Sequence, residues 1–367
     1  MALIAIENIR PQLKVGISLV THSDRTFVGR NDQGLEVISP ARVALAEMDG
    51  TRTCEELSAS CGIPLSELTL LLHELDDAGL IDTEKAKISV HTRFHSPNAN
   101  RATHEGDDSN DGAVQQLKAR LLPELTSTTW LPMVRDGGVS AISQRRDWQL
   151  AIHGDTRIAT LLYGILLASG VTRTSLICAD ARRRIQEVDM CAGFLHPSDI
   201  GLPFKARVQE LSRELSLFPT VKGAESIRTV ERKFAIAVGN IPADQIQEWM
   251  SEGIPHLFID APDSAKISIG PCVIPGQSPC ARCISMTLED QNSAWREIHM
   301  EKLVKPASDV PVALAHNVAG LAALEVLRYM DEGQSELIGK RVGIDYHHPS
   351  VALPQSFTRH PACGCNW

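Results

Sequence analysis

The 367-residue sequence contains no apolar run long enough to cross a bilayer, and it has a deficit of positive charge. The first residues, Met1 to Pro11, also lack the cationic-then-apolar pattern of a signal peptide. We therefore expect a cytoplasmic protein without membrane contact. Lys and Arg number 36 against 45 Asp and Glu, and the net charge of -9 gives no support to nucleic-acid binding. A chain of this length is expected to form two domains.

Nine cysteines stand in a chain that we expect in a reducing compartment, where metal ligation is favoured over disulfides. Four of them form two distant doublets, Cys280 with Cys283 and Cys363 with Cys365. Short spacers let one turn present two sulfurs to one metal, so the doublets predict a structural Zn²⁺ site. A disulfide or unrelated buried thiols are the alternatives, and His360 is an alternative ligand. We interpret the other five as small core residues: Cys54, Cys61, Cys178, Cys191 and Cys272.

A polar segment at residues 96–112 divides the chain. It holds almost nothing that could be buried, which is typical of a flexible linker. We therefore predict a small module at residues 1–95 and a larger α/β domain at residues 113–367.

The small module has the outline of a winged helix, with a three-stranded sheet followed by three helices. Thr53, followed by two acids, is the predicted N-cap of the second helix, and Gly62 is its predicted end. Leucines at helical spacing predict the third helix. The predicted strands are residues 15–20, 26–28 and 35–38, and the predicted helices are residues 39–48, 53–62 and 64–79.

Charge argues against the usual DNA-binding role of a winged helix. Residues 1–95 carry nine Lys and Arg against fourteen Asp and Glu, and residues 64–79 include four acids and no Lys or Arg. Because phosphate neutralisation supplies most non-specific DNA affinity, we expect no nucleic-acid partner. A peptide that adds a strand to the sheet edge is the favoured partner, with a purely structural appendage as the alternative.

The larger domain opens with the pattern of a nucleotide-binding βαβ unit. A buried strand enters a turn at Gly154, a helix follows, and a second strand ends at Asp180. The loop after Gly154 lacks the further glycines that let the backbone approach a phosphate, and Asp155 places a carboxylate there. Because this carboxylate would repel the phosphates of ATP, we predict that ATP does not bind. Asp180 and Lys205 are the remaining candidates for nucleotide contacts.

Several features resemble the ThiF-type fold of the ubiquitin-activating and sulfur-carrier-adenylating enzymes. They are the βαβ opening, the stretch Ser198-Asp199-Ile200-Gly201 before Lys205, both cysteine doublets and an apolar helix from Val310 to Met330. The runs Ile274 to Cys283 and His360 to Cys365 look like the ThiF-like leader-peptide-binding proteins of azoline and azole peptide biosynthesis. Residues 1–95 are similar to the PqqD-like peptide recognition element. The resemblance implies a Rossmann-type domain held by zinc, and it favours a homodimer.

Departures from this family determine the predicted function. Adenylating relatives carry a glycine-rich loop and an acid after a later strand, whereas Val238-Gly239-Asn240-Ile241 holds no carboxylate. Lys205 does match a lysine of active members. We therefore predict a non-catalytic scaffold that presents a ribosomal precursor peptide to a YcaO-type cyclodehydratase. The alternative is an ATP-dependent ThiF-type adenylating enzyme that acts on the peptide.

The leader of the precursor is predicted to add as a strand along residues 35–38 and to pack against the helix at residues 64–79. The helix leucines also suit an internal core, so both roles stay open for them. The predicted peptide-binding residues are Leu35, Val37, Ile38, Leu68, Leu72 and Leu75.

Overall fold

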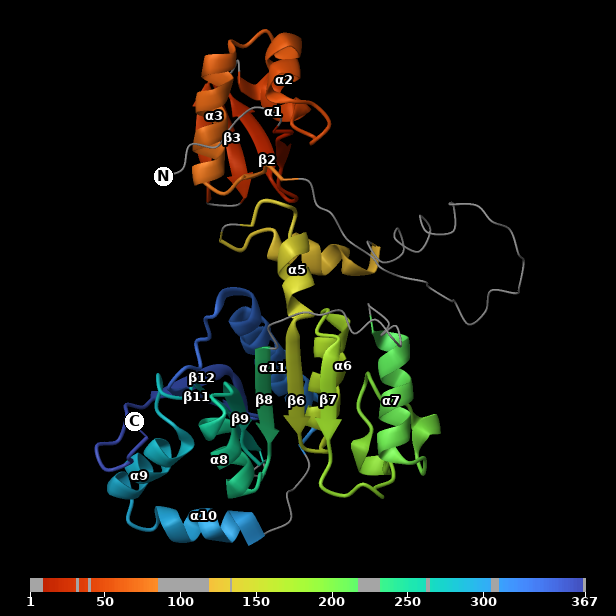
Figure 1. The fold of residues 1–367 in the computed structure, drawn as a ribbon, viewed down its shortest axis with the longest axis vertical. Coiled ribbons are helices and arrows are strands. Elements are labelled where there is room, and N and C mark those ends of the chain that lie inside the picture. The colour runs from red at the N-terminus through yellow and green to blue at the C-terminus, as the bar shows by residue number, and fades with distance from the viewer. Residues whose placement is uncertain are drawn as a thin grey trace, which may run out of the picture. The chain divides into compact units, whose positions relative to one another are not determined.

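The computed structural model describes residues 9–30, 33–38, 41–84, 119–132, 134–216, 232–261, 265–304 and 310–365. The chain forms two compact units, Met1–Ser143 and Gln144–Trp367 (Figure 1). The predicted linker at residues 96–112 lies outside the described residues. Among the helices of the described segments, none is long and apolar enough to cross a membrane.

The first unit combines a three-stranded antiparallel sheet with three helices. The sheet has the order β2-β3-β4, so β2 and β4 form its edges. A short pair of strands, β1 and β5, lies outside this sheet. The elements are β1 (Gln12–Leu13), β2 (Ser18–His22), β3 (Arg25–Arg30), β4 (Gln33–Ile38), α1 (Ala41–Glu47), α2 (Cys54–Cys61), α3 (Leu65–Asp77) and β5 (Ile81–Asp82).

The ends of α2 confirm the predicted capping. The Thr53 hydroxyl accepts the Glu56 N–H at 3.3 Å, and the Glu56 carboxylate accepts the Thr53 N–H at 2.7 Å. This reciprocal pair satisfies two N–H groups at the helix start. Gly62 ends the helix at a φ of +66°, a conformation that glycine adopts without strain.

A buried lysine ties the first strands of this unit to the segment after residue 118. The Lys14 ammonium donates to the carbonyl oxygens of Thr129 at 2.6 Å and Val134 at 2.8 Å. Arg135 forms an ion pair with Asp76 of α3. Residues well beyond the predicted 1–95 module therefore pack with the first unit.

The second unit contains a seven-stranded mixed sheet with the order β12-β11-β10-β9-β8-β6-β7. β7, β6, β8 and β9 are parallel, and the remaining pairs are antiparallel. The strands are β6 (Trp148–His153), β7 (Arg173–Ile177), β8 (Arg232–Val238), β9 (His256–Ile259), β10 (Lys266–Val273), β11 (Lys340–Asp345) and β12 (His348–Ser356). The helix α5 (Val139–Arg145) spans the boundary between the units, and the helices of the second unit are α6 (Arg157–Ala168), α7 (Phe204–Leu215), α8 (Ala243–Ser251), α9 (Ala281–Gln291), α10 (Trp295–Val304) and α11 (Val312–Glu332).

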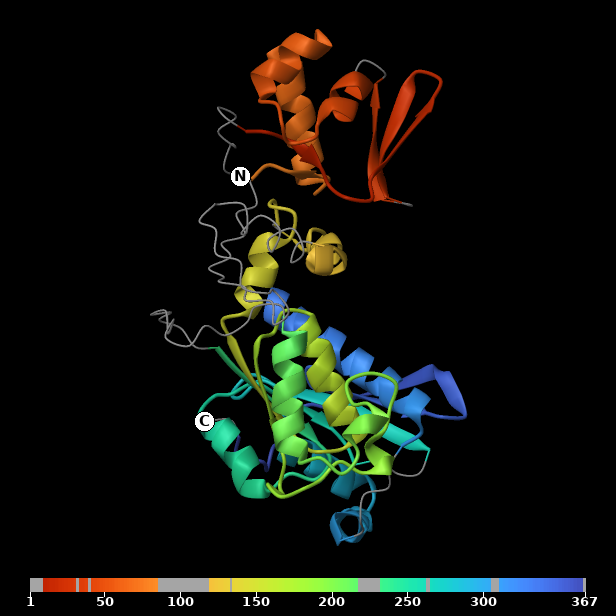
Figure 2. The same ribbon diagram turned by 90° about the vertical axis from the view of Figure 1, so that its right-hand side faces the viewer.

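Alternate residues of β8 face the two sides of this sheet. Phe234 and Ile236 belong to the large core that α6 and α11 complete. Ala235 and Ala237 pack with Trp249 of α8 in a separate cluster. Figure 2 shows α8 on one side of the sheet and α6, α7 and α11 on the other. The central strand β8 is therefore buried on both faces, as expected where helices connect parallel strands.

Candidate functional site

The four cysteines of the two doublets meet in space. Their sulfur atoms all lie within 4.8 Å of one another, with 3.3 Å between Cys283 and Cys365 and 3.5 Å between Cys280 and Cys363. Zn–S bonds of about 2.3 Å in a tetrahedron place sulfurs about 3.8 Å apart, so the spacing fits a metal. All four are free thiols, which removes the disulfide alternative. The cluster could hold a metal ion.

Local structure positions each sulfur. Cys280 is the N-cap residue of α9 and Cys283 lies in its first turn, while the other doublet follows β12 near the C-terminus (Figure 1). His360 holds that second segment in place. Its Nε2 lies 2.9 Å from a carboxylate oxygen of Asp290 on α9, and its Nδ1 accepts the Ala362 N–H at 3.2 Å. The geometry gives His360 a supporting role beside the four-sulfur cluster.

The surroundings of Cys283 favour its thiolate. Burial acts to raise the pKa of this thiol, but hydrogen bonds from the backbone at His360 and Cys280, together with the neighbouring thiols, lower it to about 7. Burial also raises the pKa of Cys363 above the ordinary value. A bound cation would favour the thiolate form of all four ligands.

A second group of polar residues lies where β6, β7 and β8 end. The three strands are parallel, so their carboxyl ends share one edge of the sheet (Figure 1). Gly154 follows β6 at a φ of +140°, and a Cβ there would lie 2.7 Å from the Val238 carbonyl oxygen of β8. Close approach of this carbonyl therefore requires glycine here, independently of any phosphate.

In the loop after Gly154, the Asp155 carboxylate is not the unpaired negative charge that the sequence predicts. Asp155 is paired with Arg183, whose Nε lies 3.2 Å from its carboxylate. The Thr156 hydroxyl caps α6, which therefore begins at Arg157. The Arg157 guanidinium donates to the carbonyls of Val188 and Val310.

The two candidate nucleotide contacts belong to the same group. The Asp180 carboxylate accepts the Arg182 N–H at 2.8 Å and closes a turn soon after β7. Lys205 is exposed in the first turn of α7. Burial raises the pKa of the Cys178 thiol to about 11, and this thiol interacts electrostatically with Asp155, Arg183, Lys205 and Asp180. Of these four residues, Asp155 and Arg183 are in direct contact, and the charges of Lys205 and Asp180 act on the same thiol.

Two residues of this edge were missed in the sequence. Arg183 stands in a run of three arginines directly after Asp180, and that run was the available signal. Asp244, in the first turn of α8, is the first carboxylate after β8.

The predicted peptide-binding residues occupy two environments in the first unit. Leu68, Leu72 and Leu75 are buried in the core on α3, and Val37 is buried on β4. Leu35 is half-buried, whereas the Ile38 side chain is 72% exposed at the end of β4. An edge strand with an exposed apolar side chain is suited to strand addition.

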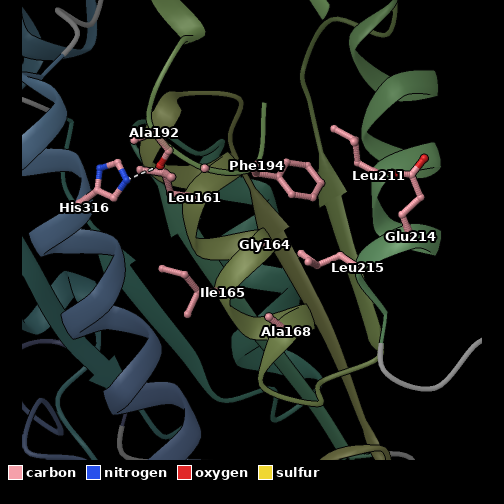
Figure 3. Close-up of a pocket in the computed structure, with 11 residues that line it drawn as sticks. Leu161, Gly164, Ile165, Ala168, Ala192, Phe194, Leu211, Glu214, Leu215 and His316 are labelled. Carbon is pink, nitrogen blue, oxygen red and sulfur yellow. Dashed lines mark hydrogen bonds between the residues drawn. The ribbon is translucent and has the colours of Figure 1, made fainter. Parts of the chain in front are cut away.

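A cavity of about 440 Å³ lies between α6, α7 and α11 (Figure 3). The ring nitrogens of His316, on α11, contact the carbonyl oxygens of Val312 and Ala192. Among the described residues of the lining, Glu214 is the single carboxylate and none is Lys or Arg, so they do not suit phosphate. The lining residues are Leu161, Gly164, Ile165, Ala168, Ala192, Gly193, Phe194, Leu211, Glu214, Leu215 and His316.

The chain has the fold of a known biosynthetic enzyme. No family model and no curated protein matches the sequence. The structure is similar to E. coli MccB with ATP over 97% of this chain and 99% of that chain, with a TM-score of 0.65 and 13% identity. The microcin C7 biosynthetic enzyme MccB in complex with N-formylated MccA matches over the same shares, with a TM-score of 0.62 and 13% identity. The heterocyclase TruD matches over 97% of this chain and 42% of that chain, with a TM-score of 0.59 and 11% identity.

This likeness contradicts two predictions. The chain was expected to be a non-catalytic scaffold and not to bind ATP, but MccB, which shares its fold, is a biosynthetic enzyme solved with ATP. The physical reason lies in the loop after β6. The Asp155 carboxylate, expected to repel phosphate, is compensated by Arg183, and the glycine spacing reflects packing against Val238. The glycine-poor loop is therefore no argument against catalysis.

Proposed function

We propose that this chain is an ATP-dependent enzyme that adenylates a ribosomally made peptide. The observation that carries the proposal is the likeness to MccB, which extends over 97% of this chain and 99% of that one. MccB has been solved with ATP and with N-formylated MccA. Both ligands of the proposed reaction thus have counterparts in the matching structures.

The residues at the carboxyl ends of β6 and β7 suit such a reaction. A peptide carboxylate oxygen attacks the α-phosphorus of ATP, the bond from that phosphorus to the bridging oxygen breaks, and pyrophosphate leaves with the electron pair. Lys205 supplies positive charge for the phosphates, and Asp180 can accept hydrogen bonds from the ribose hydroxyls.

Peptide-dependent exchange of labelled pyrophosphate into ATP tests this function. Wild-type protein, supplied with short peptides encoded beside its gene, is expected to catalyse exchange. Lys205→Ala is expected to lower the rate by about a hundredfold, the usual effect of removing one group that stabilises transition-state charge. Lys233→Ala is the matched control, because Lys233 is paired with Glu252 at the other end of β8. Absence of exchange with every such peptide would refute the proposal.

We further propose that the peptide adds as a strand to β4 of the first unit. Its main chain would pair with Leu35, Val37 and Ile38, while the buried Leu68, Leu72 and Leu75 hold α3 in the core of the unit. The Ile38 side chain offers apolar area that a bound peptide would cover.

Substitution at this edge should weaken peptide binding. Ile38→Asp is expected to raise the Kd by at least about tenfold, because burial of such a side chain contributes about 1.5–3 kcal/mol. Fluorescence anisotropy of a labelled peptide measures the change. Val20→Asp is the control, since Val20 is 57% exposed on β2, the opposite edge of the same sheet. Equal affinities for the two variants would place the peptide elsewhere.

We also propose that the four-cysteine cluster holds Zn²⁺ in a structural role. Four protein sulfurs complete a tetrahedral site and leave no open position for a substrate. The bound metal would link α9 to the segment after β12.

A YcaO-type partner and a homodimer stay predictions, as do the domain boundaries 1–95 and 113–367.

A further inference from the structure

Arg183 has one hydrogen-bond donor group to spare. Its Nε lies 3.2 Å from Asp155, its Nη2 pairs with the buried carboxylate of Asp189, and its guanidinium lies over the Phe204 ring at 4.5 Å. Its Nη1 is buried and has no hydrogen-bond partner within the described part of the chain. A buried donor without a partner is unfavourable, so a group that accepts its hydrogen bond would bind favourably.

The position of this donor group matches the edge where the proposed nucleotide site lies. Arg183 follows β7 and shares the surroundings of Cys178 with Lys205 and Asp180. The neighbouring arginines are engaged differently: Arg157 donates to two carbonyls, and Arg184 donates to the Gly201 carbonyl at 2.6 Å. A guanidinium presents its donors in a planar fork that matches phosphate oxygens.

We propose that Arg183 binds the polyphosphate of a nucleoside triphosphate, in place of the backbone N–H groups that a glycine-rich loop supplies. This inference rests on the proposed function. It assigns to Arg183 the phosphate binding that the glycine-poor loop does not provide. Asp189 and Phe204 hold the guanidinium in place, and Asp155 neutralises it when no anion is present.

Titration calorimetry with MgATP, inorganic tripolyphosphate and adenosine tests the assignment. Arg183→Gln is expected to weaken binding of MgATP and of tripolyphosphate by about tenfold or more and to leave adenosine binding unchanged, since charged hydrogen bonds contribute about 1.5–3 kcal/mol. Arg213→Gln, which removes an exposed charge in the last turn of α7, is the control and should bind all three ligands as the wild type does.

The outcomes separate this assignment from the proposed function. If the wild type catalyses exchange but Arg183→Gln binds tripolyphosphate as tightly as the wild type, the role of Arg183 is overturned and the proposed enzymatic function stands. If the wild type shows no exchange activity but Arg183→Gln loses tripolyphosphate binding, the phosphate-binding role of Arg183 is supported and the proposed enzymatic function is refuted. If Arg183→Gln fails to fold, Arg183→Lys retains the charge but lacks the fork. That variant is then expected to show the same tenfold loss, and unchanged binding would overturn the assignment.

Discussion

The double variant Cys363→Ser/Cys365→Ser is expected to lose the zinc ion that wild-type protein carries at about one per chain. Its second unit should also lose several kcal/mol of unfolding free energy, because a metal ion then no longer joins the chain end to α9. The loss should stay below the about 10–16 kcal/mol found for zinc-finger peptides, since the seven-stranded sheet has its own core. Metal analysis after purification without chelator, together with urea denaturation, measures both effects.

Cys61→Ser provides the control for this experiment. Cys61 is a half-buried thiol in the first unit, and its sulfur contacts the Glu47 carboxylate, which a serine hydroxyl can also do. Its zinc content should equal that of the wild type. Wild-type protein with clearly less than one zinc per chain would contradict the four-sulfur site.

Asp331→Ala is expected to destabilise the second unit by about 3–5 kcal/mol, because it removes the carboxylate that pairs with a buried guanidinium. Asp331 and Arg145 are 5% and 4% exposed and form a two-point contact, with Nε to Oδ1 at 2.9 Å and Nη2 to Oδ2 at 2.6 Å. Arg145 also donates to the Ser169 carbonyl at 2.7 Å. The pair therefore joins the last turn of α11 to the end of α6. Thermal unfolding should show a Tm lower by about 10 °C.

Glu332→Ala is the matched control, since it removes an exposed carboxylate from the next position of the same helix. A carboxylate near a helix C-terminus is mildly unfavourable, so this variant should be as stable as the wild type or slightly more stable. Equal Tm values for the two variants would show that the buried pair does not contribute as stated.

Local signals in the sequence predicted local structure well. The capping pair of Thr53 and Glu56, the glycine end of α2 and the strand that enters the turn at Gly154 depend on neighbours within a few residues. The strand predicted to end at Asp180 is shorter, because the chain leaves β7 at Ile177. Short-range preferences locate elements but leave their ends to tertiary contacts.

The predicted peptide-binding residues show where residue pattern was insufficient. The spacing of Leu68, Leu72 and Leu75 marks one face of a helix but does not say whether core or ligand covers that face. The structure places all three in the core and leaves Ile38 exposed at the sheet edge. Exposure depends on which elements pack above a residue, and that is a property of the whole unit.

The sequence alone determined the four-sulfur cluster. Two closely spaced pairs of cysteine, a strong metal ligand, predict that both pairs bind one metal although Cys280 and Cys363 are 83 residues apart. Only the tertiary structure decided how to interpret the glycine-poor loop. From the sequence, Asp155 is expected to repel phosphate. In the structure it is paired with Arg183, 28 positions away, and Arg183 has one buried donor group without a partner among the described residues. The effect of a charge depends on its distance from other charges, and for residues far apart in the chain that distance is set by the fold.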